Sequence, residues 1–251
     1  MEALERALLY AMPNFMGIAI IIIMVISRRN VSLKNSEKMY FDKGYAAATI
    51  DDILSLLDCS KGSLYHHFDS KQDILEHLCR RHAQEAFSAW QHQVYETPLL
   101  ALNGLLYYSM PFRNGGERLL SLLLPLQNTT EGTAMRCALL DAMETLFLPQ
   151  VKEYLETLKA SGNAYWHMAR LPELVWDAHT ALYGRLMQCA ARLRQGGAAG
   201  DVVEHLESAR FLWERTLDLP FGSMEIVRAD AALQAIHQAV KHVNHLPGEQ
   251  T

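Results

Sequence analysis

The chain has 251 residues, a formal net charge of -5 and 50% apolar residues, so it can bury the core of one or two globular domains. Its eight prolines and fourteen glycines follow no collagen-like period and no long polar tract, which excludes a fibrous or disordered architecture. The four cysteines stand far apart and form no CxxC pair, which argues against a disulfide framework or zinc knuckle and favours a reducing cytoplasm.

An apolar extension precedes the rest of the chain. Residues 7–27 carry no formal charge and end in a dense apolar run over 15–26, close to the roughly 20 residues that span a bilayer, although Pro13 interrupts the stretch. As a membrane anchor it would leave everything after Arg28 in the cytoplasm. It is alternatively upstream sequence before an internal start such as Met24. A helix packed on the protein is disfavoured, because the isoleucine run has no polar face.

From residue 32 onward, apolar residues recur at spacings of three and four, and no stretch alternates as a strand would. The sequence therefore predicts an all-α fold. The first helix is expected over 32–42, followed by Gly44, which can take the left-handed geometry that closes a helix. A second helix is expected from Thr49, whose side chain can cap the amides that follow, to about Leu57.

After a three-residue turn, the sequence predicts a short helix over 61–67. A long helix capped by residues 69–70 follows and is expected to reach about residue 92. Breaks rich in Pro, Gly and Asn divide the remainder into five or six more helices. Pro125 and Pro149 fall inside apolar patterns and are expected to kink or end their helices.

The charge is distributed unevenly along the chain. Residues 28–82 carry nine Lys and Arg against eight Asp and Glu, whereas residues 83–251 carry thirteen against eighteen. An excess of one positive charge is equally typical of an ordinary solvated surface. A prediction of nucleic-acid binding therefore depends on a motif and not on net charge.

The short helices expected over 50–67 form such a motif, a helix-turn-helix. The chain here resembles the TetR/AcrR family of transcriptional regulators, over about residues 32–75. The resemblance rests on three runs: Tyr40 to Tyr45, Thr49 to Ile53 and Ser60 to Lys71. It implies three parts: an apolar extension over 1–30, a three-helix DNA-binding domain over 31–75, and a helical ligand-binding and dimerisation domain over 76–251.

A recognition helix must bring its N-terminal end into a major groove about 12 Å wide, so small side chains are expected there. Gly62 lets the backbone approach, Lys61 adds charge, and Leu64 with Phe68 forms the core side at i, i+4 spacing. The resemblance implies contacts to the DNA backbone by Thr49, Ser60, Lys61, Tyr65, His66, His67 and Lys71, with Lys61, Gly62 and Ser63 near bases.

Two structural alternatives stand beside these assignments. Thr49 can be a helix cap alone, and Tyr65 or His67 can pack against the first helix; both roles are compatible with DNA contact. The chain also departs from the family, which often has a small Ala-Gly-Val turn where this sequence has Leu, Asp58 and Cys59. Asp58 brings a negative charge near DNA, which affects affinity more than fold.

Two apolar stripes are candidates for a homodimer interface, and intramolecular core explains such stripes equally well. They comprise Leu174, Val175, Ala178, Leu182, Leu186, Cys189 and Leu193, and then Val202, Val203, Leu206, Phe211, Trp213 and Leu217. Aromatic and Met side chains that can form an adaptable apolar ligand pocket, or plain core, include Tyr107, Tyr108, Met110, Met143, Phe147, Trp166, Trp176 and Tyr183.

No signature of an enzyme is present, because the sequence lacks GxSxG, P-loop, GxGxxG and HExxH motifs, and its histidines do not form i, i+4 metal-binding pairs. We expect no cofactor and no metal. The sequence thus favours a cytoplasmic, ligand-responsive, homodimeric repressor that binds double-stranded operator DNA, with an unknown small-molecule inducer. The alternatives are a helical sensor tethered to the membrane through residues 7–27, in which DNA binding is secondary or lost, and a helical ligand-binding protein with a vestigial motif.

Overall fold

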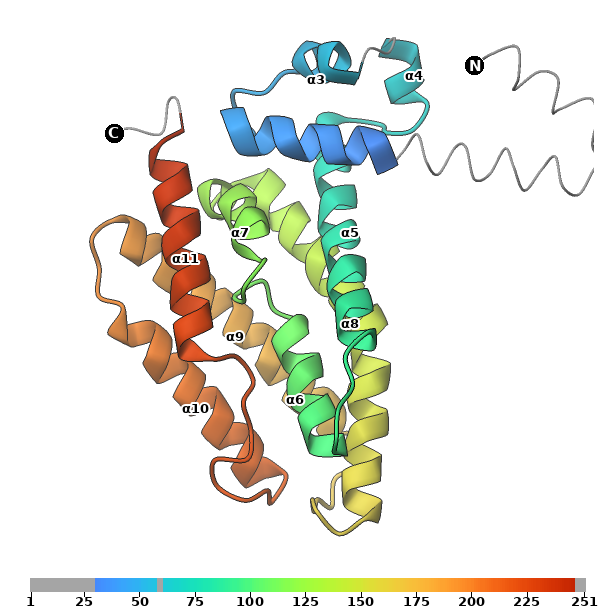
Figure 1. Cartoon of the computed structure of the whole chain (residues 1–251), viewed down its shortest axis with the longest axis vertical. Helices are drawn as coiled ribbons and strands as arrows, with labels where there is room; N and C mark the ends of the chain where they lie inside the picture. The colour runs from blue at the N-terminus through green and yellow to red at the C-terminus, as the bar shows by residue number, and fades with distance from the viewer. Residues whose placement is uncertain (1–29, 58–60, 247–251) are drawn as a thin grey trace, which may run out of the picture.

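The computed structural model describes residues 30–57 and 61–246, and within these ranges every regular element is a helix, as the apolar spacing predicts (Figure 1). The apolar segment 7–27 lies outside the described residues, so the three interpretations of it stay open. Asp58, Cys59 and Ser60 also lie outside them. In the described ranges, no helix combines the length and the apolar character needed to cross a membrane.

Three short helices form an N-terminal unit, each close to the place that the sequence predicts. A helix over 30–43 ends at Gly44, whose φ is +80°, and is followed by α3 (Ile50–Leu57) and α4 (Lys61–Tyr65). Recognition helix α4 is two residues shorter than expected. The long helix α5 (Lys71–Gln91) begins at its predicted cap, where the Ser70 side chain accepts a hydrogen bond from the Asp73 amide.

The rest of the chain folds into a C-terminal body of packed helices. In Figure 1, α5 leaves the N-terminal unit and runs down along α8, with α9, α10 and α11 on the opposite side of α7 and α6. The body consists of α6 (Pro98–Tyr108), α7 (Glu117–Leu123), the 3-10 turn η1 (Leu124–Leu126), α8 (Thr130–Ala160), α9 (Leu171–Arg194), α10 (Gly200–Thr216) and α11 (Ala229–Asn244).

The two internal prolines behave differently. Pro125 lies in η1 and ends α7, as expected. Pro149 does not end α8, which continues through it to Ala160. Its ring is exposed, while Phe147 and Val151 on either side are fully buried, so core packing on both flanks holds the helix together across the missing backbone hydrogen bond.

Most members of the two apolar stripes pack inside the chain. On α9, Val175, Leu182, Leu186 and Cys189 are at most 5% exposed, so for these residues the intramolecular alternative is correct. The same holds on α10 for Val202, Leu206 and Trp213, and for Leu217 at its C-terminal end. The reason is that α9, α10 and α11 pack against one another. Leu174, Val203 and Phe211 remain exposed.

The core also holds a neutral histidine. His179 is 1% exposed and lies 2.7 Å from the Ser109 hydroxyl through its Nε2 atom, between the rings of Trp176 and Trp213. Burial lowers the pKa of His179 from 6.5 to about 3, because the charged imidazolium is not solvated there. The ring therefore stays uncharged at neutral pH.

The first turn of α8 packs directly on η1. A Cβ atom added at Gly132 would lie 1.8 Å from the carbonyl oxygen of Leu126, a backbone atom that cannot move aside alone. A Cβ atom at Gly184 in α9 would meet nothing within 4 Å. Glycine at 132 is thus required by close approach, whereas glycine at 184 is not.

We expect Gly132→Ala to lower the free energy of unfolding by about 1–3 kcal/mol, because η1 and α8 must separate. The matched control Gly184→Ala is expected to raise it by about 0.5–1 kcal/mol, since alanine is the better helix former. Urea unfolding followed by circular dichroism measures both. Equal stability of the two variants would contradict the close packing of α8 on η1.

Candidate nucleic-acid interface

Helix α4 separates a buried side from an exposed side. Leu64 and Phe68 are each 2% exposed, as their i, i+4 spacing predicts. Lys61, Gly62, Tyr65 and His66 are exposed, and nothing lies within 4 Å of a Cβ atom built on Gly62. The first turn of α4 therefore offers a small-side-chain surface with one cation and two amphipathic rings, which fits entry into a major groove.

Thr49 caps the N-terminus of α3, and this role leaves its hydroxyl hydrogen free to donate. Its hydroxyl oxygen accepts a hydrogen bond from the Asp52 amide at 3.1 Å, and the Asp52 carboxylate accepts one in return from the Thr49 amide at 2.9 Å. This reciprocal pair is a capping box. The hydrogen bond from Lys43 lowers the pKa of Asp52 to about 2, and those from Thr49 add to the effect. The Thr49 side chain is exposed and keeps its hydroxyl hydrogen for a phosphate.

Lys71 is held inside the N-terminal unit. Its ammonium group donates a hydrogen bond to the Tyr45 carbonyl and lies 4.1 Å from the centroid of the Tyr45 ring and 5.9 Å from that of Tyr40. Burial lowers the pKa of Lys71, while the carboxylate of Glu131 on α8 acts in the opposite direction. Lys71 thus lies between the motif and the body, and does not project freely into solvent.

Part of the predicted DNA-contacting set is exposed to solvent. Thr49, Lys61, Gly62, Tyr65 and His66 are exposed on α3 and α4 or at their ends, whereas His67 and Lys71 are half-buried. Ser60 and the side chain of Ser63 lie outside what the structure describes.

A buried carboxylate that the sequence analysis missed joins the N-terminal unit to the body. Glu37 in helix 30–43 is 6% exposed and contacts three cationic groups. Arg81 donates a hydrogen bond to one of its oxygens, while His82 Nε2 and Arg118 Nε each lie 3.0 Å from the other. Burial alone would raise the pKa of Glu37, but the His82 hydrogen bond and the two arginine charges lower it to about 2. Glu37 lies four residues after Leu33 on the buried side of its helix, a position that signals a paired charge.

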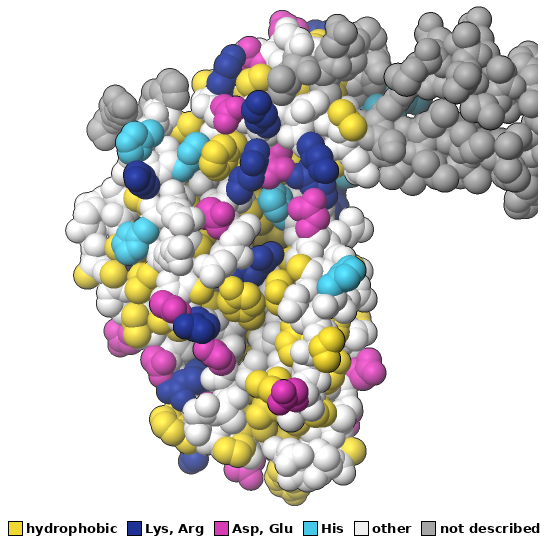
Figure 2. Space-filling model, viewed as in Figure 1, with side chains coloured by type: hydrophobic (Ala, Val, Ile, Leu, Met, Phe, Trp, Pro, Cys, Tyr) yellow, Lys and Arg dark blue, Asp and Glu magenta, His cyan; other side chains and the backbone are white. Residues whose placement is uncertain are grey.

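A second contact reinforces the junction. The Arg118 guanidinium lies 4.8 Å from the centroid of the Phe41 ring. His242 on α11 stacks on the same ring at 3.6 Å, and its Nε2 atom lies 2.7 Å from the Phe41 carbonyl. Figure 2 shows charged and histidine side chains gathered on this face, where the N-terminal helices meet the body. Side chains from α5, α7 and α11 thus hold helix 30–43 in place on the body.

Apolar packing at the junction is incomplete. A cavity of about 290 Å³ lies between Tyr40 and Tyr45 of the N-terminal unit and Ser121, Leu122 and Leu126 of the body. The clusters around Glu37 and Phe41 therefore carry much of the contact that sets the orientation of the motif.

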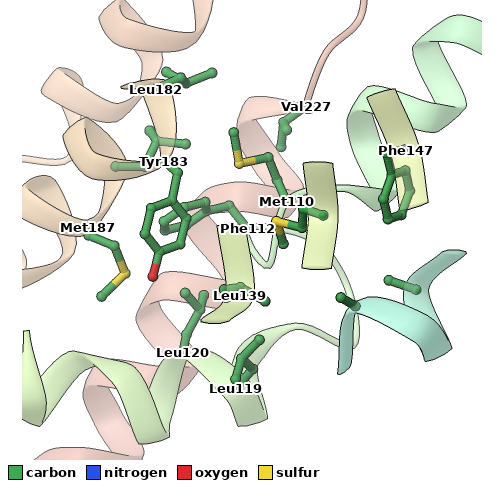
Figure 3. Packing of buried hydrophobic residues seen from close by; sticks show 14 of the residues in the cluster. Met110, Phe112, Leu119, Leu120, Leu139, Phe147, Leu182, Tyr183, Met187 and Val227 are labelled. Carbon is green, nitrogen blue, oxygen red and sulfur yellow. The ribbon is translucent and has the colours of Figure 1, made fainter. Parts of the chain in front are cut away.

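The predicted ligand-pocket residues do not surround one cavity. Met110, Phe147 and Tyr183 are buried in the packed core of Figure 3, and Met143, Trp166 and Trp176 are buried too. Tyr107 and Tyr108 instead line an open groove beside α6. Of the predicted set, Tyr183 borders a smaller cavity of about 130 Å³. In the described ranges, no cluster of three or more His, Cys, Asp or Glu side chains has the arrangement of a metal site.

We expect Glu37→Gln to destabilise the protein by about 3–5 kcal/mol at pH 7, because it leaves buried cations without their counter-charge. The pKa of Glu37 is depressed from 4.5 to about 2, so its stabilisation is present above pH 4.5 and is lost as the pH falls toward 2. The loss over this range is on the order of 3 kcal/mol in the wild type and is absent from Glu37→Gln. Urea unfolding between pH 7 and pH 2 measures it.

His179 contributes the same pH dependence of the free energy of unfolding to the wild type and to Glu37→Gln. Its depressed pKa removes stability as the pH falls from about 6.5 toward 3, because the unfolded chain is protonated first. A suitable control is Glu85→Gln, since Glu85 pairs with Arg81 at 3.3 Å but is 55% exposed, and its loss should cost less than about 1 kcal/mol. If both variants were equally stable, the Glu37 cluster would not be the main link.

The comparisons with known proteins fall on the same region. A family model described as bacterial regulatory proteins of the tetR family matches residues 33–78. Over 82 residues the chain is 38% identical to the HTH-type transcriptional repressor KstR2 of Mycolicibacterium smegmatis, which covers 32% of this chain and 40% of that protein. Over 44 residues it is 43% identical to the biofilm operon icaADBC HTH-type negative transcriptional regulator IcaR of Staphylococcus aureus, which covers 18% of this chain and 24% of that one. The chain thus spans less than half the length of these curated relatives.

A solved structure extends the likeness beyond the motif at the level of fold. A Rhodococcus sp. protein assigned to the TetR-family transcriptional regulators superposes with a TM-score of 0.50, covering 86% of this chain and 97% of that one at 14% sequence identity. The matched sequence, the capped helix-turn-helix and the helical body agree with one another. Residues 33–78 are thus similar in sequence to the tetR family of bacterial regulatory proteins, and over the rest of the chain the likeness is one of fold alone.

Proposed function

We propose that the chain is a transcriptional repressor that binds operator DNA as a homodimer and is released by a small ligand. The observation that carries the proposal is the exposed first turn of α4, held up by the buried Leu64 and Phe68. The names of KstR2 and IcaR as a transcriptional repressor and a negative transcriptional regulator support the direction of the effect. Residues 31–75 would bind DNA, and residues 76–251 would dimerise and bind the ligand.

The proposed DNA contacts divide by chemistry. Lys61, Tyr65, His66 and the Thr49 hydroxyl would contact phosphates, because these donors lie on exposed positions around the start of α4. Gly62 would let the backbone approach base edges. Lys71 would contact a phosphate only after giving up its hydrogen bond to the Tyr45 carbonyl. Because Glu131 on α8 acts on the Lys71 charge, this contribution would depend on the position of α8.

A dimer would place two copies of α4 in successive major grooves, about 34 Å apart. A change in the orientation of each N-terminal unit alters this spacing without touching the motif. The Glu37 and Phe41 clusters are where such a change would act, because they connect helix 30–43 to α5, α7 and α11. Leu174, Val203 and Phe211 are the members of the predicted stripes that stay available to a second copy.

Selection of random duplex DNA by the purified full-length chain tests the proposal. We expect a near-palindromic sequence to be enriched and to be bound by two chains. Failure of folded, dimeric protein to enrich any sequence would refute the proposed function.

The selected duplex then serves for a salt titration. Lys61→Ala should weaken binding and reduce the slope of log affinity against log salt by about 1, because one phosphate contact is lost. Lys152→Ala on α8 removes the same charge away from the motif and should leave the slope unchanged. An unchanged slope in Lys61→Ala would show that Lys61 does not contact phosphate.

A further inference from the structure

A polar cavity lies in the body between the η1–α8 turn and α9. It has a volume of about 130 Å³. Its polar lining residues are Gln127, Asn128, Gln188, Tyr183 and Arg136, of which Asn128, Gln188 and Arg136 are also exposed to solvent. Leu123 and Met187 provide an apolar lining. In Figure 3, Tyr183 and Met187 project from the same helix to the same side.

Arg136 has no counter-charge of its own. Its neighbours one turn away on α8 are Gly132 and Leu140, so its helix offers no carboxylate at i-4 or i+4. No hydrogen bond or ion pair within the described ranges involves its side chain. Other arginines of the body do have acidic partners, as Arg192 has Asp201 at 3.0 Å and Arg210 has Glu207. An unpaired guanidinium beside a polar cavity is suited to bind an anion.

We propose that this cavity binds a small organic carboxylate, with Arg136 as the partner of the carboxylate group. The inference rests on the proposed function, because it names the class of ligand to which the repressor would respond. A planar guanidinium matches a carboxylate with two parallel hydrogen bonds, and the side-chain amides can donate to it as well. The apolar lining and the Tyr183 ring would contact a short chain or a single ring. Inorganic phosphate would leave that lining without a partner.

The size of the cavity restricts the ligand. An apolar protein cavity of roughly 150 Å³ is known to hold benzene. A cavity of about 130 Å³ is therefore suited to a one-ring or short-chain acid, with its carboxylate at Arg136. A larger ligand would have to displace Met187 or Tyr183, and both are buried.

The cavity adjoins a turn that also faces the N-terminal unit. Asn128, Gly132 and Arg136 line the cavity, and between them Glu131 acts electrostatically on Lys71 and Tyr45. The close approach of Gly132 to the Leu126 carbonyl means that this turn and η1 shift together. A carboxylate bound at Arg136 would therefore bias the turn that sets the surroundings of Lys71.

Isothermal titration calorimetry of the purified full-length chain tests the proposal, with benzoate as the probe and benzamide as its uncharged analogue. We expect saturable binding of benzoate and at least tenfold weaker binding of benzamide. Arg136→Gln should weaken benzoate at least tenfold, and the exposed Arg185→Gln on α9 serves as the matched control with unchanged affinity. Gly184→Leu should abolish binding, because a side chain there points into open space and fills the cavity without a clash.

Benzoate binding that both cavity variants leave unchanged, or no binding of benzoate at all, would overturn the proposal. Inorganic phosphate competing as well as benzoate would also overturn it, in favour of a general anion site. The DNA selection described above is independent of these titrations. Enriched DNA without benzoate binding refutes the cavity and leaves the repressor, whereas benzoate binding without enriched DNA does the opposite.

Discussion

The position of the helix-turn-helix motif depends on one buried charge. Glu37 is removed from water, and it is tolerated there because Arg81, His82 and Arg118 surround it from two other helices. An ion cluster of this kind has few alternative geometries, unlike an apolar contact that can slide. Helix 30–43 therefore packs on the body in one orientation. Ile53, Leu64 and Phe68 are buried in the same hydrophobic cluster as Leu33 and Tyr40 of that helix, which ties the orientation of α3 and α4 to the seating of helix 30–43.

Helix α5 connects the helix-turn-helix motif to the body in which the proposed ligand cavity lies. It begins with a capped turn directly after the motif and continues along α8, burying Leu75, Leu78 and Ala83. Arg81 and His82 lie in its middle, so the helix that enters the body also holds the first helix of the chain. A shift of η1 and the first turn of α8 would reach the motif through two routes, the Glu131 field at Lys71 and the Arg118 contact to Glu37. One route reaches the N-terminal unit at Lys71 and the other reaches it at Glu37.

Local features of this fold could be predicted from the sequence, whereas long-range ones could not. The caps at Thr49 and Ser70 were predicted because each depends on residues three positions apart. The partners of Glu37 were missed because Arg81 is 44 residues away, and only the folded chain brings them together. The apolar stripes and aromatic residues had the right pattern for burial but did not say what would cover them. Tyr183 at a cavity and Tyr107 in an open groove are equivalent in sequence and differ only in packing.

The described side chains of α4 divide into one that is buried in the core and three positions that face solvent. Leu64 anchors the helix, while Lys61, Gly62 and Tyr65 make no contribution to the core, and even Gly62 has open space where a side chain would go. Substitutions on the exposed side thus cost little in folding and, if this surface binds DNA as proposed, would change which sequence is preferred. On the proposed function, a lineage carrying this scaffold could acquire new operators by single steps, each compatible with a stable protein, while the junction at Glu37 and Phe41 stays unchanged. The residues that would set sequence preference and the residues that would retain regulation are separate in this architecture, so each set can vary without the other.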